Sequence, residues 1–211
     1  MRSVLGDSEM NTDELEARLE GQAETQSLEF KAASPWDVTK LAKDIIALAN
    51  VQDGGLIIIG VEDGTFVRQG VPPEQSSTFR LEVMKDQMAA YADPHINFSV
   101  EFPQDRDGRL YVVIRVLPFE EIPVICKRDS QETQAGTIYY RNRNRRVESA
   151  RVSNSYDMRD IIEVATVRMM ERKRRLGFTI SAQPSSPTIS ERARPTSSID
   201  SNKFDEELDG L

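Results

Sequence analysis

The chain has 211 residues, a length that allows one domain with a hydrophobic core and at most one further small unit. Its hydrophobic fraction of 38% and charged fraction of 29% are ordinary for a soluble protein. A single cysteine excludes an internal disulfide and a thiolate metal cluster, and it favours a reducing, cytoplasmic compartment. No apolar run approaches the length of a bilayer span, so we expect no membrane association.

The net charge of −8 is unevenly distributed along the chain. The first 30 residues and residues 179–211 carry the excess of acids, and the part between them holds 21 acidic and 22 basic residues. Arginines concentrate in two stretches of this near-neutral part, at 141–151 and 168–175. The acidic pI of about 4.9 therefore does not exclude nucleic acid as a partner.

The two ends of the chain differ in composition from the middle. Residues 1–22 are predicted to form an acidic segment with a short helix over 13–20 and Thr12 as its N-cap. Residues 178–211 are rich in serine and proline and are predicted to form a disordered acidic tail. The domain itself is predicted over 23–177.

The first informative segment is 27–32, where apolar and polar residues alternate. This alternation predicts a half-buried strand, with Leu28 and Phe30 toward the core and Glu29 and Lys31 together on the other face.

The remaining elements alternate between helical and strand patterns. We expect helices over 36–50, 77–91 and 156–176, and strands over 56–61, 97–102, 110–117, 124–127 and 137–141. The continuous apolar run at 56–61 indicates a central strand buried on both faces, and Asp107-Gly108 indicates a hairpin turn. The fold class is therefore α+β (mixed α/β), with a mixed, largely antiparallel sheet flanked by helices.

Three carboxylates and a lysine near the first two strands form a candidate site. Glu24 precedes the first strand, Glu29 and Lys31 share one of its faces, and Asp63 follows the buried run. If the two strands pair, the acids reach the same edge of the sheet, where they would suit Mg²⁺ or Mn²⁺, and the lysine would steady a phosphate. By residue type alone, a Glu-x-Lys pair on a strand is more often a solvated pair than a catalytic element.

The sequence resembles the Schlafen AlbA_2 domain over about Glu24 to Val152. The resemblance rests on four segments: Glu24-Thr-Gln-Ser-Leu-Glu29-Phe-Lys31, Ile46-Ala-Leu-Ala-Asn50, Gly54-Gly-Leu-Ile-Ile-Ile-Gly60-Val-Glu-Asp63 and Gly136-Thr-Ile-Tyr-Tyr-Arg141. It implies a nucleic-acid-binding domain. In the Schlafen nucleases, metal-binding acids occupy the positions that match Glu24, Glu29 and Asp63.

Two functions follow from this resemblance. One is a Mg²⁺- or Mn²⁺-dependent endoribonuclease that acts on structured RNA such as transfer RNA, with Glu24, Glu29, Lys31 and Asp63 as catalytic residues. The other is a regulatory module that binds DNA or RNA without cutting it.

The nucleic-acid surface is expected along the arginine-rich stretch, because guanidinium groups pair with phosphate and release its counterions. Its candidate residues are Lys31, Tyr139, Arg141, Arg143, Arg145, Arg146 and Arg151. The alternative is a solvated edge strand whose charges oppose aggregation.

Further expectations concern cofactors and partners. One histidine and one cysteine do not support a zinc site, and the glycine segments lack the lysine of a nucleotide-binding loop. A single lobe would enclose a duplex only as a homodimer. Residues 204–211 interleave acids with apolar residues, a pattern that allows a solubilising tail, a motif for a protein partner, or an acidic cover for the arginines. A partner motif would make a third function possible, that of a protein-interaction adaptor acting through its tail.

Overall fold

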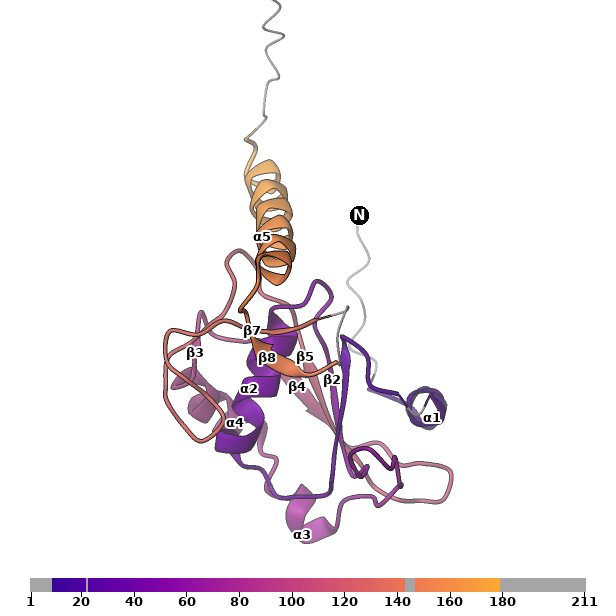
Figure 1. Cartoon of the computed structure of the whole chain (residues 1–211). Coiled ribbons are helices and arrows are strands. Elements are labelled where there is room, and N and C mark those ends of the chain that lie inside the picture. The colour runs from indigo at the N-terminus through magenta and orange to yellow at the C-terminus, as the bar shows by residue number, and fades with distance from the viewer. Residues whose placement is uncertain (1–8, 22, 143–146, 179–211) are drawn as a thin grey trace, which may run out of the picture. The chain divides into compact units, whose positions relative to one another are not determined.

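The computed structural model describes residues 9–21, 23–142 and 147–178 (Figure 1). Its centre is a four-stranded sheet with the order β1-β2-β5-β4. These strands are β1 (Leu28–Lys31), β2 (Gly55–Ile59), β5 (Val112–Val116) and β4 (Phe98–Glu101). β1 and β2 run parallel, whereas β2, β5 and β4 pair antiparallel. The mixed, largely antiparallel sheet expected from the sequence is confirmed.

Helices and two short strand pairs surround this sheet. The helices are α1 (Thr12–Glu20), α2 (Val38–Ala49), α3 (Pro73–Ser76), α4 (Leu81–Ala89) and α5 (Ser155–Arg175). The pairs are β3 (Ala92–Asp93) with β6 (Ile125–Cys126), and β7 (Tyr139–Arg141) with β8 (Ser149–Arg151). The sequence did not predict α3, β3 or β8, because two to four residues are too few to show a period.

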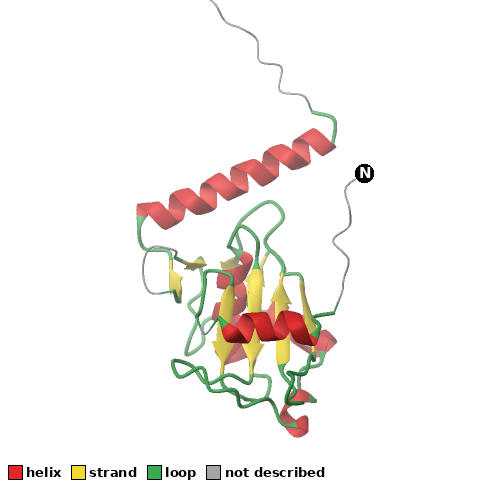
Figure 2. Ribbon diagram, turned by 90° about the vertical axis from the view of Figure 1, so that its right-hand side faces the viewer, coloured by secondary structure: helices red, strands yellow, loops and turns green. Residues whose placement is uncertain are grey.

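Both faces of the sheet are covered, which explains the continuous apolar run of β2. Ile57 and Ile59 pack in the larger core with α2, and Leu56 and Ile58 pack in a second core with α1. Figure 2 shows α1 crossing the sheet on the face opposite α2. The prediction of a central strand buried on both faces is therefore confirmed.

α1 is held on the sheet by apolar packing and by ion pairs. Leu15 and Leu19 are buried, and between them Glu16 accepts hydrogen bonds from Arg68 Nη1 at 2.8 Å and from the Arg106 backbone N–H at 2.9 Å. The predicted N-cap was wrong by one residue. Asn11 caps the helix instead, in a capping box with Glu14, because its side chain lies one residue before the first helical turn.

Asn50 ends α2 and fixes the segments that follow β5. Its Nδ2 donates to the carbonyl oxygens of Val124 and Tyr139, each at 2.9 Å, and its Oδ1 accepts the Val124 N–H at 2.7 Å. The side chain is 1% exposed, so these bonds satisfy it inside the core. Asn50 thereby places β7 next to the end of α2.

Among the described residues, no helix is long and apolar enough to cross a bilayer. The tail expected over residues 178–211 lies outside the described residues beyond Phe178.

Gly54 precedes β2 at a point where the backbone packs closely against its neighbours. Its φ is 69°, and a Cβ at this position would lie 2.2 Å from the Val116 carbonyl oxygen. Gly64 has a similar φ of 76° but has no atom within 4 Å of that position. We expect Gly64→Ala to cost about 1–2 kcal/mol from its φ alone, and Gly54→Ala about 1–3 kcal/mol more from the clash. Urea denaturation measures both, and equal losses would contradict the packing.

Candidate functional site

The carboxylate of Glu29 lies between two cations. Its Oε1 is 2.5 Å from Lys31 Nζ, and its Oε2 accepts a hydrogen bond from Arg141 Nη1. Arg141 is fully buried, and its Nη2 also donates to the carbonyl oxygens of Thr25 and Leu28 at 3.1 Å and 3.2 Å. The last residue of β7 is therefore tied to β1 by its side chain.

The strand alternation of β1 is confirmed, but one consequence drawn from it is corrected. Leu28 and Phe30 do face an apolar core, on the α1 side. Glu29 is on the other face, which was expected to be solvated, yet it is only 6% exposed. The physical reason is that α2 and β7 cover that face and bring Lys31 and Arg141 as partners for the carboxylate.

Asp44 of α2 completes this cluster, and it was not predicted as a site residue. Its Oδ2 lies 3.0 Å from Lys31 Nζ, and the residue is 2% exposed. Burial lowers the pKa of Lys31, but the charges of Asp44 and Glu29 outweigh burial and raise it above its ordinary value of 10.5. A signal was present in the sequence, since Asp44 stands three residues after Leu41 and four before Leu48 on the buried side of α2.

Glu24 approaches the same cluster from the segment before β1. Its Oε1 accepts the backbone N–H of Phe30 at 3.2 Å. Burial and the negative charge of Glu29 raise the pKa of Glu24 above its ordinary value of 4.5, and Asp63 adds to the rise. The structure therefore brings the three predicted acids within electrostatic range of one another.

These acids are not arranged to hold a metal ion. Across residues 9–21, 23–142 and 147–178, no group of three or more His, Cys, Asp or Glu side chains could enclose one. Asp63 is exposed, and both oxygens of Glu29 are already paired with cations. As placed, these residues would have to rearrange, with Glu29 released from Lys31 or Arg141, before they could hold the Mg²⁺ or Mn²⁺ expected from the resemblance.

The expected nucleic-acid surface is only partly present among the described side chains. Arg141 and Tyr139 are buried, so neither offers its side chain to a ligand in this structure; the Tyr139 hydroxyl accepts the Gln134 N–H at 2.8 Å. Arg151 is exposed and donates to Gln134 Oε1. Arg143, Arg145 and Arg146 lie outside the described residues.

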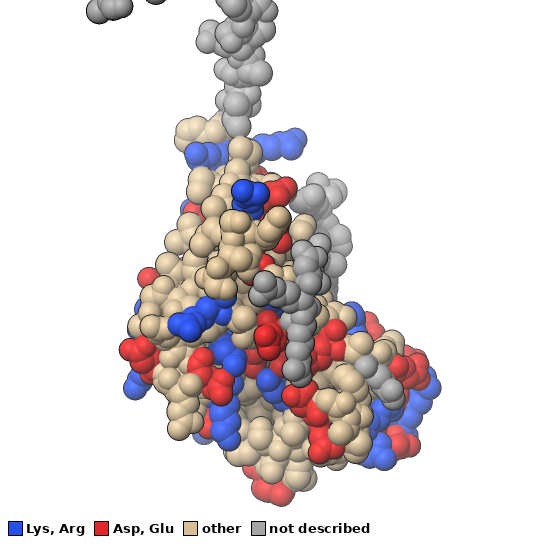
Figure 3. Space-filling model, in the orientation of Figure 1, with Lys and Arg blue, Asp and Glu red and all other residues tan. Residues whose placement is uncertain are grey.

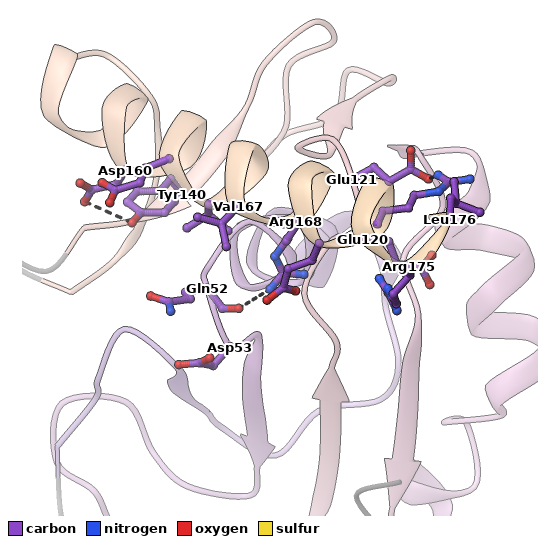
Figure 4. Close-up of a pocket in the computed structure, with 14 residues that line it drawn as sticks. Gln52, Asp53, Glu120, Glu121, Tyr140, Asp160, Val167, Arg168, Arg175 and Leu176 are labelled. Carbon is purple, nitrogen blue, oxygen red and sulfur yellow. Dashed lines mark hydrogen bonds and ion pairs between the residues drawn. The ribbon is translucent and has the colours of Figure 1, made fainter. Parts of the chain in front are cut away.

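A cleft of about 1000 Å³ lies between α5 and the loops that follow α2 and β5. Arg168 spans it and donates to the backbone oxygens of Phe119 and Gln52 (Figure 4). Around Arg168 the lining holds more carboxylates than arginines, among them Asp53, Glu120 and Asp160. Such a lining disfavours the phosphate backbone of nucleic acid.

The face shown in Figure 3 has no continuous basic area. Basic and acidic side chains are interspersed over the sheet domain, and basic side chains gather again at the far end of α5, where Arg172, Lys173, Arg174 and Arg175 are exposed.

The fold and the site define an α+β domain with a mixed sheet and a buried acid–arginine pair at its edge strand. A family model described as Schlafen, AlbA_2 matches residues 24–150, which is more than half of the chain. The chain belongs to the Schlafen AlbA_2 family. Membership suggests nucleic-acid binding, and α1 and α5 lie outside the matched residues.

No curated protein matches the chain. Among solved structures, the crystal structure of the DIP2311 protein from Corynebacterium diphtheriae is similar, with 17% sequence identity and a TM-score of 0.46. The similarity covers 69% of this chain and 27% of that one, so this chain spans about a quarter of the length of the solved protein.

The buried pair of Glu29 and Arg141 generates a stability prediction. Glu29→Ala leaves the guanidinium buried without its counter-ion and should lower the free energy of unfolding by about 3–5 kcal/mol, measured by urea denaturation. Asp13→Ala breaks an exposed pair with Arg106, whose side chains are 86% and 64% exposed, and should cost less than about 1 kcal/mol. Replacing Glu29 and Arg141 together by methionine should recover much of the loss, and equal losses in the two single variants would contradict the assignment.

Glu24 generates a pH prediction. Because its pKa is raised in the folded state, the folded state binds this proton more tightly, and ionisation of Glu24 favours unfolding as the pH rises. Glu24→Gln keeps an acceptor for the Phe30 N–H, so it should be more stable than the parent near neutral pH. The difference should vanish below pH 4.5, where the unfolded carboxyl is also protonated. Glu82→Gln, on the exposed side of α4, is the control; a gain at neutral pH equal to that of the control would reject the prediction.

Proposed function

We propose that the protein binds nucleic acid through the basic connection between β7 and β8. One observation carries the proposal: the strand that leads into this connection ends at Arg141, which the buried pair with Glu29 fixes to β1. Family membership supports the same function, since the matched residues include β7 and most of β8.

The anchoring of the connection supports binding on physical grounds. Asn142 Nδ2 donates to Asp157 Oδ1 at 2.5 Å, and on the far side β8 pairs antiparallel with β7. Arg143, Arg145 and Arg146 follow directly from the anchored end in the sequence. A segment whose two ends are fixed has less backbone entropy to lose on binding than one with a free end.

Metal-dependent cleavage by Glu24, Glu29 and Asp63, with Lys31 beside the phosphate, is the second candidate function. The closeness of the three acids favours it, since Glu29 and Asp63 lie near enough to add to the rise that burial causes in the pKa of Glu24, and such groups cluster at functional sites. In this arrangement, however, Glu29 would first have to release Lys31 or Arg141. We therefore place binding first.

The experiment measures fluorescence anisotropy of labelled transfer RNA, single-stranded RNA and duplex DNA with the full chain over a series of salt concentrations. Replacing Arg143, Arg145 and Arg146 by alanine should weaken binding about tenfold or more, and it should reduce the salt slope by about 1 for each arginine that contacts phosphate. Unchanged affinity would remove this surface from the proposal.

A variant with the same change in charge controls for non-specific attraction. Arg18, Arg80 and Lys85 are exposed on α1 and at α4, and their replacement by alanine should leave affinity within about twofold. The same samples, incubated with Mn²⁺ or with EDTA, report cleavage on a denaturing gel. Cleavage that needs Mn²⁺ and is lost in Glu24→Gln, while binding persists, would establish the second function instead.

A further inference from the structure

α5 carries a line of apolar side chains that the rest of the domain leaves uncovered. Met158, Ile162 and Met169 are 38%, 56% and 41% exposed and follow one another at spacings of four and seven residues. Leu176, which caps the helix and is 65% exposed, continues the line. At 3.6 residues per turn the four positions fall within about 40° of the helix circumference. We call these four residues the α5 stripe.

The α5 stripe does not face the interior of the domain. Ile161 is the buried apolar residue through which α5 packs against the body, and Val164 and Ala165 are partly buried there. The centre of the stripe lies roughly 75° around the helix from Ile161 and about 35° from Ala165, so one edge of the stripe borders the body of the domain. Figures 1 and 2 show α5 at the periphery of the domain, and the exposure of the stripe residues leaves them accessible to a partner.

Basic residues flank the α5 stripe on both sides of the helix. By helix geometry, Arg159 and Lys173 stand on one side, and both are exposed. Arg168, Arg172 and Arg175 stand on the other side, which lines the cleft; there Arg168 donates to the carbonyl oxygens of Phe119 and Gln52, and Arg172 pairs with Glu121. The acids of the middle of α5 are elsewhere: Asp160, Glu163 and Glu171 all line the cleft beside α5. The flank of Arg159 and Lys173 is therefore the one left for a partner, which needs apolar side chains for the stripe and negative charges beside this flank.

A second copy of the chain does not meet this requirement. In an antiparallel pair of α5 helices, Arg159 of one copy would face Lys173 of the other, and in a parallel pair Arg168 would face Lys173. Like charges across a helix pair are destabilising. A homodimer through α5 is disfavoured in both orientations.

The shape of the stripe also favours a partner helix over two other anionic partners, a membrane surface and a nucleic acid. A helix that lies on a membrane buries a broad apolar face, whereas a narrow stripe is typical of a seam between two helices. Val167 and Met170 are exposed too, but they lie on other sides of α5 and do not widen the stripe. A nucleic-acid backbone would pair with the basic side chains of α5 but would leave its apolar side chains exposed to water.

We propose that α5 binds an acidic amphipathic helix of a partner protein. Apolar side chains of the partner pack along the α5 stripe, and its carboxylates pair with Arg159 and Lys173 on the exposed flank. This surface is separate from the connection between β7 and β8, so the protein binds its protein partner and its nucleic acid through different elements.

The test titrates the full chain into a fluorescein-labelled synthetic helix of about three heptads, with leucine at the a and d positions and glutamate at e and g. An otherwise identical helix with lysine at e and g is the matched probe. We expect anisotropy to report binding of the glutamate helix and at least about tenfold weaker binding of the lysine helix, a difference of about 1.4 kcal/mol.

Two pairs of substitutions locate the contact. Ile162→Ser with Met169→Ser should weaken binding of the glutamate helix about tenfold. Val167→Ser with Met170→Ser removes side chains that are each 51% exposed, but off the stripe, and should leave binding within about twofold. Arg159→Glu with Lys173→Glu should reverse the preference between the two probes. Circular dichroism of each variant checks that the helix content is retained.

Several outcomes would overturn the proposal. Equal binding of both probes, or equal loss in both serine variants, would show general adhesion and not a helix site. Sedimentation with phosphatidylserine vesicles that is lost in the stripe variant, without binding of either helix, would assign the stripe to a lipid surface. Binding that appears only after Phe204→Ala and Leu208→Ala would point to the chain's own terminal segment as the occupant. RNA affinity is measured in parallel, so failure of the helix-binding proposal can be distinguished from failure of the nucleic-acid proposal.

Discussion

The ion pair between Glu29 and Arg141 is the interaction on which the arrangement of the site depends. β7 and β8 form a separate pair of strands, and no backbone ladder joins them to the main sheet in the described residues. β1 is an edge strand, and side chains close its edge: Arg141 Nη2 donates to the Thr25 and Leu28 carbonyls, and Gln26 Nε2 donates to the Arg141 carbonyl at 2.8 Å. The side chain of Arg141 thus donates hydrogen bonds to the edge of β1 as a neighbouring strand would, and it protects this edge from pairing with another chain.

Four charges line up through this cluster in alternating sign, from Asp44 through Lys31 and Glu29 to Arg141. Their sum is zero, which keeps the Coulomb energy of the group favourable although three of the four residues are buried. Desolvation offsets much of that gain, and Arg141 Nε has no hydrogen-bond partner. A cluster of this kind contributes little net stability, but it permits one register of β7 against β1, because any other would leave a charge unpaired.

The elements that depend on neighbouring residues could be predicted from the sequence. The apolar run of β2 and the turn between β4 and β5 carry their own patterns, so their place in the sheet could be predicted. Arg141 could not be placed in this way. It begins a run of arginines, a composition typical of surfaces, and its partner Glu29 is 112 positions away in the chain. Burial of such a pair is decided by tertiary packing, which no window of neighbouring residues reports. Asp44 could be predicted in part. A lone acid on the apolar side of a helix indicates that it has a buried partner, but not which residue that partner is.

The residues that identify the family are thus partly engaged in holding the fold together. Lys31, expected beside a phosphate, is paired with Asp44 and Glu29, so a ligand phosphate would compete with two carboxylates for it. Such competition disfavours the binding of a phosphate at β1. The hydrogen bond from Asn142 to Asp157 then gains a structural meaning, because it joins the start of the β7–β8 connection to the first turn of α5. The connection and the helix share one anchor, and the two proposed surfaces lie on elements that are packed together.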